Sequence, residues 1–339
     1  MLNAILIICG AAAAVFLIFL LTAVITEYRP ADQEMLQDLS STADDSSILP
    51  DSLTVLCWNI GYGGLGDDMD FFYDGGTQVR TSRKRTKANI DGIIAEIRRH
   101  SPDIVLLQEV DECSRRTYRI DEVEMLRKAF PEYHIYMAYN YRSFFVPIPV
   151  KAPMGKVSSG VVLMSKAAPE KAVRWQYPSR FPWPVSMFNL KRCLLTATYR
   201  LADGSTVIIG NTHNTAYDTG NMRTVETAFL GEMTARLASE GTHFIIGGDW
   251  NQFPPDYSPS AAETVALDTA LLQGSGRIAW DPSSKTLRHL NIPYIPSESV
   301  LTVTDYFYIS RNINADSIST IDLQFRNSDH QPVLMHCRI

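Results

Sequence analysis

The residues best suited to chemistry lie in the stretch Gly247–Asn251, which reads Gly-Gly-Asp-Trp-Asn and follows the apolar run Phe244–Ile246. Residues two apart on an extended strand point the same way, so we expect Asp249 and Asn251 to face one site. The glycines allow backbone or ligand to approach closely. This pair can orient a water molecule or a metal-bound phosphate. Taken alone, however, the stretch is more typical of a turn.

Other apolar runs also lead into polar residues. Asn59 lies at the C-terminal end of the run Thr54–Ile60, Glu109 ends the run Asp103–Glu109, and His213 follows the run 206–212. An unpaired carboxylate at the mouth of a buried strand is costly, and a role as a magnesium ligand would explain Glu109. Further along, Asp305 lies in an alternating run, and Ser328-Asp329-His330 precedes the last one.

The elements that must position these groups alternate between strands and helices. Apolar stripes at helical spacing predict helices through Ile90–Ile97 and Val225–Leu237, and another helix is expected over 122–130. Ala202-Asp203-Gly204 predicts a hairpin. Apolar or alternating runs predict strands at 54–60, 103–109, 134–138, 160–165, 191–199, 206–212, 244–249, 303–309 and 331–337.

The first 26 residues are a separate segment. Ala4–Thr26 carries no charged residue and is long enough to cross a bilayer as a helix. A cleaved secretory signal is the alternative, but no Lys or Arg precedes the run and no clean small-x-small site precedes Glu27. The preferred interpretation is an uncleaved single-pass anchor at 1–26. The flanking charges specify orientation poorly, so an extracytoplasmic catalytic domain in the cell membrane is expected only by default.

Residues 27–52 are polar and acidic and are predicted to form a flexible tether, which leaves 53–339 as the catalytic domain. The net charge of −6 does not indicate general attraction to nucleic acid. The five cysteines have neither zinc-site nor disulfide-scaffold spacing. The basic cluster Arg80–Lys87 is more typical of a solvated face than of a phosphate-binding patch.

Two stretches, Tyr139–Pro153 and Trp175–Phe188, are rich in aromatic residues and proline and are predicted to be loops. Loops of this kind usually pack on their own domain. The alternative is a surface that meets lipid or an amphiphilic substrate, which the expected anchor makes more plausible.

The order of the polar groups resembles that of the endonuclease/exonuclease/phosphatase superfamily of DNase I-like proteins. The resemblance is carried by Trp58-Asn59, Gln108-Glu109, Asn211-Thr212-His213, Gly248-Asp249-Trp250-Asn251 and Ser328-Asp329-His330. It spans about Thr54 to Ile339. It implies an α/β (α+β) fold, a four-layer α/β/β/α sandwich of two mixed sheets flanked by helices, with the site at the sheet edge.

The resemblance also implies a Mg²⁺- or Mn²⁺-dependent hydrolase of phosphate esters. Its metal ligands would be Asn59, Glu109 and Asp329. The catalytic groups would be Asp249 on the attacking water, Asn251 on the phosphate or metal, His213 and His330 as donors to the phosphate, and Asp305 to orient His330. The number of metal ions and the identity of the general base stay open.

The substrate is not specified by these motifs. Gln252-Phe253 stands where inositol phosphatases carry Tyr-Arg, and a membrane tether suits genomic repair poorly. The expected substrates are phosphodiesters, lipid head groups or nucleic acid outside the cell, as for a nuclease or a sphingomyelinase-like phospholipase, with no obligate protein partner. A tethered binding protein without turnover is the alternative of another class.

Overall fold

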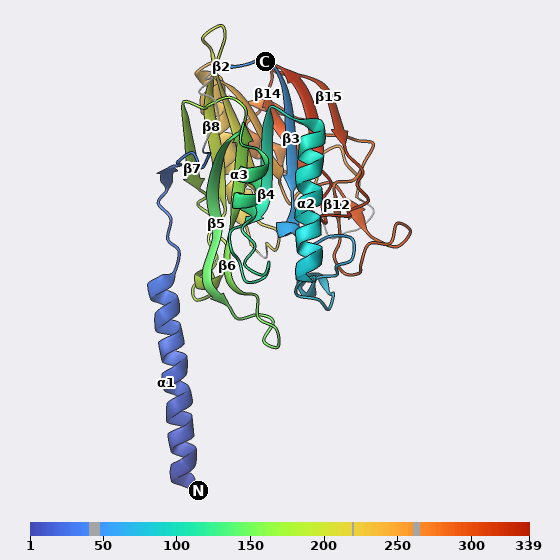
Figure 1. Ribbon diagram of the computed structural model, residues 1–339. Coiled ribbons are helices and arrows are strands. Elements are labelled where there is room, and N and C mark those ends of the chain that lie inside the picture. Colours follow the sequence, from blue (N-terminus) through green and yellow to red (C-terminus); the bar gives the residue numbers. More distant parts are fainter. Residues whose placement is uncertain (41–47, 219, 260–264) are drawn as a thin grey trace.

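The computed structural model describes residues 1–40, 48–218, 220–259 and 265–339. In this part of the chain, two mixed β-sheets pack face to face with helices on their outer faces (Figure 1). The predicted four-layer sandwich is confirmed.

One sheet has the strand order β15-β16-β3-β4-β6-β5. Within it, β3 and β4 are parallel and the other neighbours are antiparallel. Helices α2 (Arg83–His100) and α3 (Glu122–Ala129) cover its outer face. The strand bounds are β3 Ser52–Asn59, β4 Ile104–Asp111, β5 His134–Val146, β6 Gly155–Ser165, β15 Asn314–Thr320 and β16 Val333–Arg338.

The other sheet has the order β1-β7-β8-β9-β10-β14-β11, and β2 pairs with β8. Helix α4 (Met222–Ser239) covers its outer face, and a separate ribbon joins β12 (Leu287–Arg288) to β13 (Leu301–Thr302). The remaining bounds are β1 Gln33–Met35, β2 Ile48–Leu49, β7 Lys171–Gln176, β8 Cys193–Leu201, β9 Thr206–His213, β10 His243–Asp249, β11 Gly276–Ala279 and β14 Asp305–Ser310.

The two sheets are held in register by a polar contact inside an apolar interface. Leu106 and Phe307 belong to the buried cluster between the sheets, and a Cβ on Gly247 would come within 2.8 Å of both side chains. Gln108 donates a 2.7 Å hydrogen bond from Nε2 to Oδ1 of Asn211. Because this bond joins β4 to β9, it aligns the ends of strands that belong to different sheets.

The helical stripes pack as predicted. Ile90, Ile93 and Ile97 of α2 are buried against the first sheet, and Met233 and Leu237 of α4 are buried against the second. In the basic cluster at the start of α2, Arg85 pairs with Asp67 and Asp68, and Lys87 pairs with Asp91.

Several boundaries differ from the prediction. The stretch from Tyr139 is not a loop at first, because β5 continues to Val146 and pairs with β6, which begins at Gly155. Trp175 lies within β7, which was missed along with β11 and β15. β11 and β15 are short or polar strands at the edges of their sheets, and β7 lies next to the three-residue edge strand β1. Periodicity alone does not reveal such strands.

The segment 27–52 is not a free tether where it is described. Glu27 forms a 3.0 Å ion pair with Lys191, and Asp38 accepts a 2.6 Å hydrogen bond from Nδ1 of His134. Strands β1 and β2 pair with β7 and β8. The acidic and serine-rich part at 41–47 lies outside the described residues. Local composition predicted flexibility, but edge pairing with distant strands holds these residues on the domain.

Candidate active site

The expected site residues come together where the strands end. β9 and β10 are parallel and place His213 beside Asp249, and antiparallel β14 places Asp305 on the other side of Asp249. A cavity of about 650 Å³ opens at this edge. It is lined by all the predicted site residues except Asp305, which lies behind His330: Asn59, Glu109, His213, Asp249, Asn251, Asp329 and His330.

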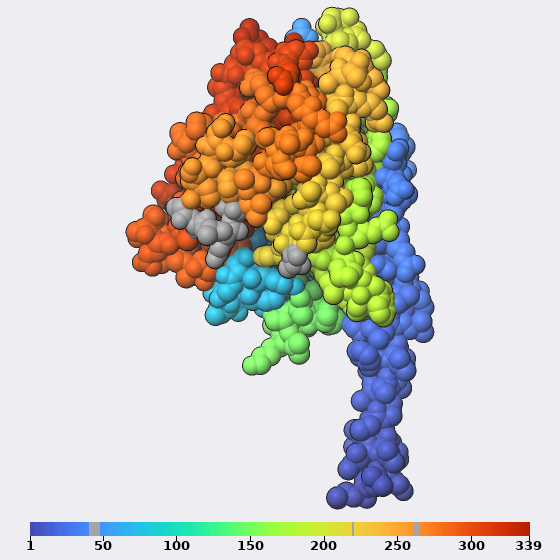
Figure 2. All heavy atoms as spheres, turned by 180° about the vertical axis from the view of Figure 1, so that it is seen from behind, coloured from blue at the N-terminus to red at the C-terminus, as the bar shows by residue number. Residues whose placement is uncertain are grey.

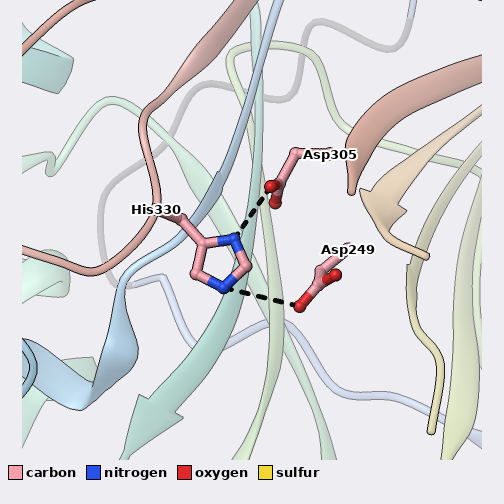
Figure 3. A group of neighbouring side chains, drawn as sticks. All are labelled: Asp249, Asp305 and His330. Carbon is pink, nitrogen blue, oxygen red and sulfur yellow. Dashed lines mark hydrogen bonds and ion pairs between the residues drawn. The ribbon is translucent and has the colours of Figure 1, made fainter. Parts of the chain in front are cut away.

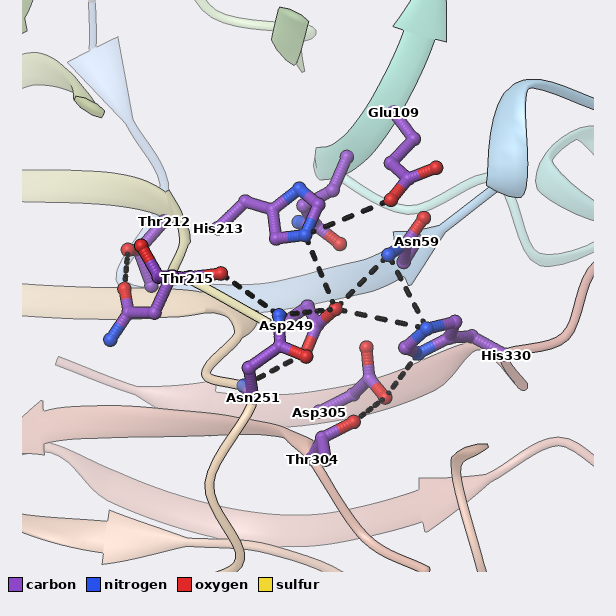
Figure 4. Close-up of polar contacts among 12 residues, drawn as sticks. Asn59, Glu109, Thr212, His213, Thr215, Asp249, Asn251, Thr304, Asp305 and His330 are labelled. Atoms are coloured by element: carbon purple, nitrogen blue, oxygen red, sulfur yellow. Dashed lines mark hydrogen bonds and ion pairs between the residues drawn. The ribbon is translucent and has the colours of Figure 1, made fainter. Parts of the chain in front are cut away.

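Asp249 is the centre of the polar network (Figure 4). Its Oδ2 accepts hydrogen bonds from Nδ2 of Asn59 at 3.1 Å and Nδ2 of Asn251 at 3.2 Å, and its Oδ1 accepts one from the amide of Asn251. Asn251 has a positive φ of 50° and also donates to the carbonyl of Asn214. Burial raises the pKa of Asp249 to about 6, although the charge of His330 opposes the shift.

His330 is held between two carboxylates (Figure 3). Its Nδ1 lies 2.8 Å from Oδ2 of Asp305, and its Nε2 lies 3.7 Å from Oδ2 of Asp249. Thr304 donates a hydrogen bond to the same Asp305 oxygen. Burial alone lowers the pKa of His330, but the negative charges of Asp305, Asp249 and Asp329 raise it to about 10. The ring is therefore a cation at neutral pH.

His213 differs from His330 in charge. Its Nε2 lies 3.5 Å from Oδ2 of Asp249 and 3.8 Å from Oε1 of Glu109. Burial, together with the positive charges of Arg192 and His330, lowers the pKa of His213 well below its usual range. Its ring is therefore neutral and can donate one N–H into the cavity.

Glu109 faces the cavity from β4, and Asp329 faces the same cavity from the connection between β15 and β16. Glu109 has a positive φ of 57° at an irregularity in the pairing of β4 with β6, which turns its side chain out of the sheet. Asp329 lies against Gly61, where a Cβ would come within 2.8 Å of its Oδ1. Burial, and then the charge of Glu109, raises the pKa of Asp329 to about 7. The two carboxylates therefore repel each other.

This pair suits a hard divalent cation, because a bound cation would relieve the repulsion and carboxylate and amide oxygens are its usual ligands. Asn59 supplies an amide oxygen at the same edge. Asp249, Asp305 and His330 also offer ligand atoms within 4.8 Å of one another. In that group, however, Asp305 and His330 already contact each other at 2.8 Å. Glu109, Asp329 and Asn59 are therefore the set that could hold the cation with fewer existing contacts broken.

Arg192, which the sequence analysis missed, lines the cavity at the start of β8. Its side chain is buried, and its Nη1 has no hydrogen-bond partner. Within the described residues, no ion pair joins it to a carboxylate. Two other buried arginines of the cavity do have partners: Arg116 forms a bidentate pair with Asp111, and Arg288 donates to backbone carbonyls, including that of Gly66. Arg192 is therefore available to an anionic ligand.

The glycine-rich stretch after β3 forms one wall of the cavity. Tyr62, Phe71 and Tyr73 belong to the cavity lining. Across the opening, Tyr73 stacks on Tyr217 with ring centroids 5.5 Å apart, and Tyr217 donates a 2.8 Å hydrogen bond to Asp74. Contacts between segments far apart in the sequence therefore hold this wall of the cavity together.

The sandwich and the site together define a phosphoester hydrolase of the DNase I-like class. The sequence matches the model of the Endonuclease/Exonuclease/phosphatase family over residues 56–330, and the chain belongs to that family. No curated protein matches the sequence.

Similar solved structures support the fold. An endonuclease/exonuclease/phosphatase from Bacteroides vulgatus is 16% identical with a TM-score of 0.56, over 85% of this chain and 99% of that one. ANGEL2, a 2′,3′-cyclic phosphatase, is 16% identical with a TM-score of 0.56, over 92% of this chain and 99% of that one. The human nocturnin catalytic domain with bound sulfate is 17% identical with a TM-score of 0.54, over 89% and 97%. At these identities the similarity establishes the fold alone.

Proposed function

We propose that this chain is a Mg²⁺- or Mn²⁺-dependent hydrolase of phosphate esters, anchored in the membrane by its N-terminal helix. The observation that carries the proposal is the convergence of two repelling carboxylates, a neutral and a charged histidine, and a buried aspartate on one cavity.

The ligand oxygens in this proposal are those of Glu109, Asp329 and Asn59. When bound to these oxygens, a divalent cation would neutralise the negative charge that develops on the phosphate oxygens. Asn59 also donates to Asp249, so it links the ligand set to the catalytic aspartate. Arg192 adds a fixed cation that suits a phosphate oxygen not involved in bond breaking.

The proposed roles of the other residues follow from their charges. Asp249 is ionised at neutral pH and orients the attacking water or accepts its proton, while Asn251 fixes the carboxylate. His330, held by Asp305, and His213 donate to the phosphate oxygens as charge develops. Water adds to phosphorus and one ester P–O bond breaks. The departing oxygen receives a proton.

The proposal predicts metal-dependent hydrolysis by the purified full chain in detergent. The substrates to test are bis-p-nitrophenyl phosphate, plasmid DNA, RNA, sphingomyelin and inositol phosphates, with Mg²⁺ or Mn²⁺ and with a chelator. We expect turnover of at least one class and its loss with chelator. Activity that survives the chelator would contradict the metal assignment, and turnover of nothing would favour the tethered binding protein.

Arg192 gives a second prediction. Arg192→Gln is expected to lower kcat/KM by about 10- to 100-fold, because a charge-assisted hydrogen bond contributes about 1.5–3 kcal/mol. The melting temperature should stay the same or rise, since an unpaired buried cation is removed. Arg200→Gln, at an exposed arginine paired with Glu170, is the matched control and should retain full activity. If Arg192→Gln lowers the melting temperature as well as kcat/KM, Arg192 has a structural role instead.

The anchor is supported by one helix, α1 (Leu2–Thr26), which is long and apolar enough to span a bilayer. A signal sequence near the N-terminus meets the same criteria. If the helix is a retained anchor, the protein in cell membranes should resist extraction by alkaline carbonate, and its intact mass should include residues 1–26. We propose the extracytoplasmic side for the catalytic domain.

A further inference from the structure

We infer that the substrate is a phospholipid in the bilayer that α1 crosses, and that the active-site opening is fixed against the surface of that bilayer. This inference rests on the proposed function and names its substrate class. It is drawn from the contacts that join α1, the two aromatic segments and the cavity.

Helix α1 packs on the catalytic domain through aromatic side chains near its C-terminal end. Phe19 stacks on Phe188 with ring centroids 5.7 Å apart. It also contacts Phe144 at 5.7 Å and Phe145 at 6.2 Å. Ala23, one turn later, is buried, whereas the rest of the helix is largely exposed. The two aromatic segments of the sequence therefore meet on the apolar helix itself.

The chain after α1 fixes the angle of the helix. Besides the pair between Glu27 and Lys191, Tyr28 lies under the guanidinium groups of Arg142 and Arg174, at 5.6 and 5.9 Å. β1 then continues the sheet beyond β7. Because these contacts leave no free linker between α1 and β1, the domain cannot turn freely above the bilayer.

The segments that touch α1 also form a wall of the cavity. Phe181 and Leu190 line it from the segment that carries Phe188, and Tyr141 and Met154 line it from the two sides of the β5–β6 hairpin. Figures 1 and 2 show this hairpin, in green, at the end of the domain from which α1 emerges. The opening of the site thus lies on the side where the proposed bilayer begins.

The two segments that contact α1 also carry exposed apolar side chains. We define the rim as Ile148, Val150, Trp183 and Val185, all of which are exposed. Val150 is 87% exposed and Trp183 is 70% exposed, values that are unfavourable for apolar side chains in water. Basic residues interrupt the rim at Lys151 and Arg180, both exposed. Trp with interspersed Lys and Arg is typical of a membrane interface.

The position of Phe19 along α1 matches an interfacial depth. The 25 residues of α1 span about 38 Å, compared with about 30 Å of bilayer hydrocarbon. The helix continues about two turns past Phe19, or roughly 10 Å. The aromatic cluster therefore lies near the boundary between head groups and acyl chains, and the rim lies at head-group level, where lipid phosphodiesters are located.

Hydrolysis of such a lipid balances with water alone. Water adds to phosphorus, one P–O ester bond breaks, the alcohol leaves with a proton, and a phosphomonoester remains. A nucleic-acid strand fits less well, because the rim is apolar and the chain has a net charge of −6.

The test uses the full chain reconstituted in vesicles containing equal parts of phosphatidylcholine, phosphatidylglycerol and sphingomyelin. The variant is the double substitution Val150→Ser and Trp183→Ser, neither of which is at a cavity residue. Ile48→Ser is the control, since Ile48 is 56% exposed on β2 at the opposite end of the domain (Figure 1). Three activities are measured: hydrolysis of vesicle lipid, of soluble bis-p-nitrophenyl phosphate and of a single-stranded oligonucleotide.

We expect the wild type to hydrolyse vesicle lipid. In the rim variant this activity should be lower by at least about fivefold, while cleavage of the soluble diester should be unchanged. Ile48→Ser should change neither activity. Brominated lipid should quench Trp183 fluorescence in the wild type, and that quenching should be missing from the variant. Diester cleavage without lipid cleavage, preference for the oligonucleotide, or lipid cleavage insensitive to the rim would overturn the inference and leave the proposed function standing. Failure on every substrate would remove both.

Discussion

Glu109→Gln is expected to lower metal-dependent hydrolysis by about 1,000-fold, because it removes one of the two carboxylates proposed to hold the cation, an effect of about 4 kcal/mol. The substitution preserves the size of the side chain. It also removes the charge that repels Asp329, so the melting temperature should stay the same or rise. The measurements are kcat/KM with Mg²⁺ and Mn²⁺, and Mn²⁺ binding by calorimetry.

The control for this prediction is Glu112→Gln. Glu112 follows the same strand but accepts a hydrogen bond from Tyr139 outside the cavity lining. It should retain activity and Mn²⁺ binding. Full activity of Glu109→Gln, or unchanged Mn²⁺ affinity, would show that the metal ligands lie elsewhere in the cavity.

His330→Gln is expected to reduce turnover by about 1,000-fold, because the only charged imidazole between Asp249 and Asp305 among the described residues is lost. Stability should also fall by about 3–5 kcal/mol, since Asp305 is left as a buried carboxylate without its partner. Activity assays and denaturant unfolding measure the two effects separately.

The double variant Asp305→Asn with His330→Gln distinguishes chemistry from folding. Replacing both charged partners by amides removes the unpaired buried charge, so most of the lost stability should return. Turnover should remain as low as in His330→Gln. Recovery of turnover along with stability would mean that His330 acts only by holding the fold together.

The fold could be predicted where local pattern and burial coincide. The stripes of α2 and α4 and the apolar strands β3, β4, β9 and β10 follow from periodicity, because each buries one face or both in the sandwich. β5 was expected to end at Ala138 but reaches Val146. Pairing with β6 stabilises the extended conformation of residues whose sequence is typical of a loop. β1 was missed for the same reason, since its partner is β7.

For the candidate site, the sequence identified residue types but not their charges. Asp249 and Glu109 were found because polar groups at the ends of apolar strands are conspicuous, and His330 was found in the polar motif that precedes the last strand. That His213 is neutral and His330 charged depends on which groups surround each ring after folding. The sequence could not identify Arg192 for a related reason. What distinguishes this arginine is that its buried Nη1 has no hydrogen-bond partner, and burial is known only after folding.

By itself, the sequence determined the order of the strand-end groups and the apolar helix at residues 2–26, since both are written in local composition and spacing. The four-layer class of fold followed from the family resemblance that those groups carry. Only the tertiary structure decided that the segment after α1 is bound to the domain and that Phe19 meets Phe144 and Phe188 beside the cavity. These features depend on contacts between residues more than a hundred positions apart, and chain folding alone brings such residues together.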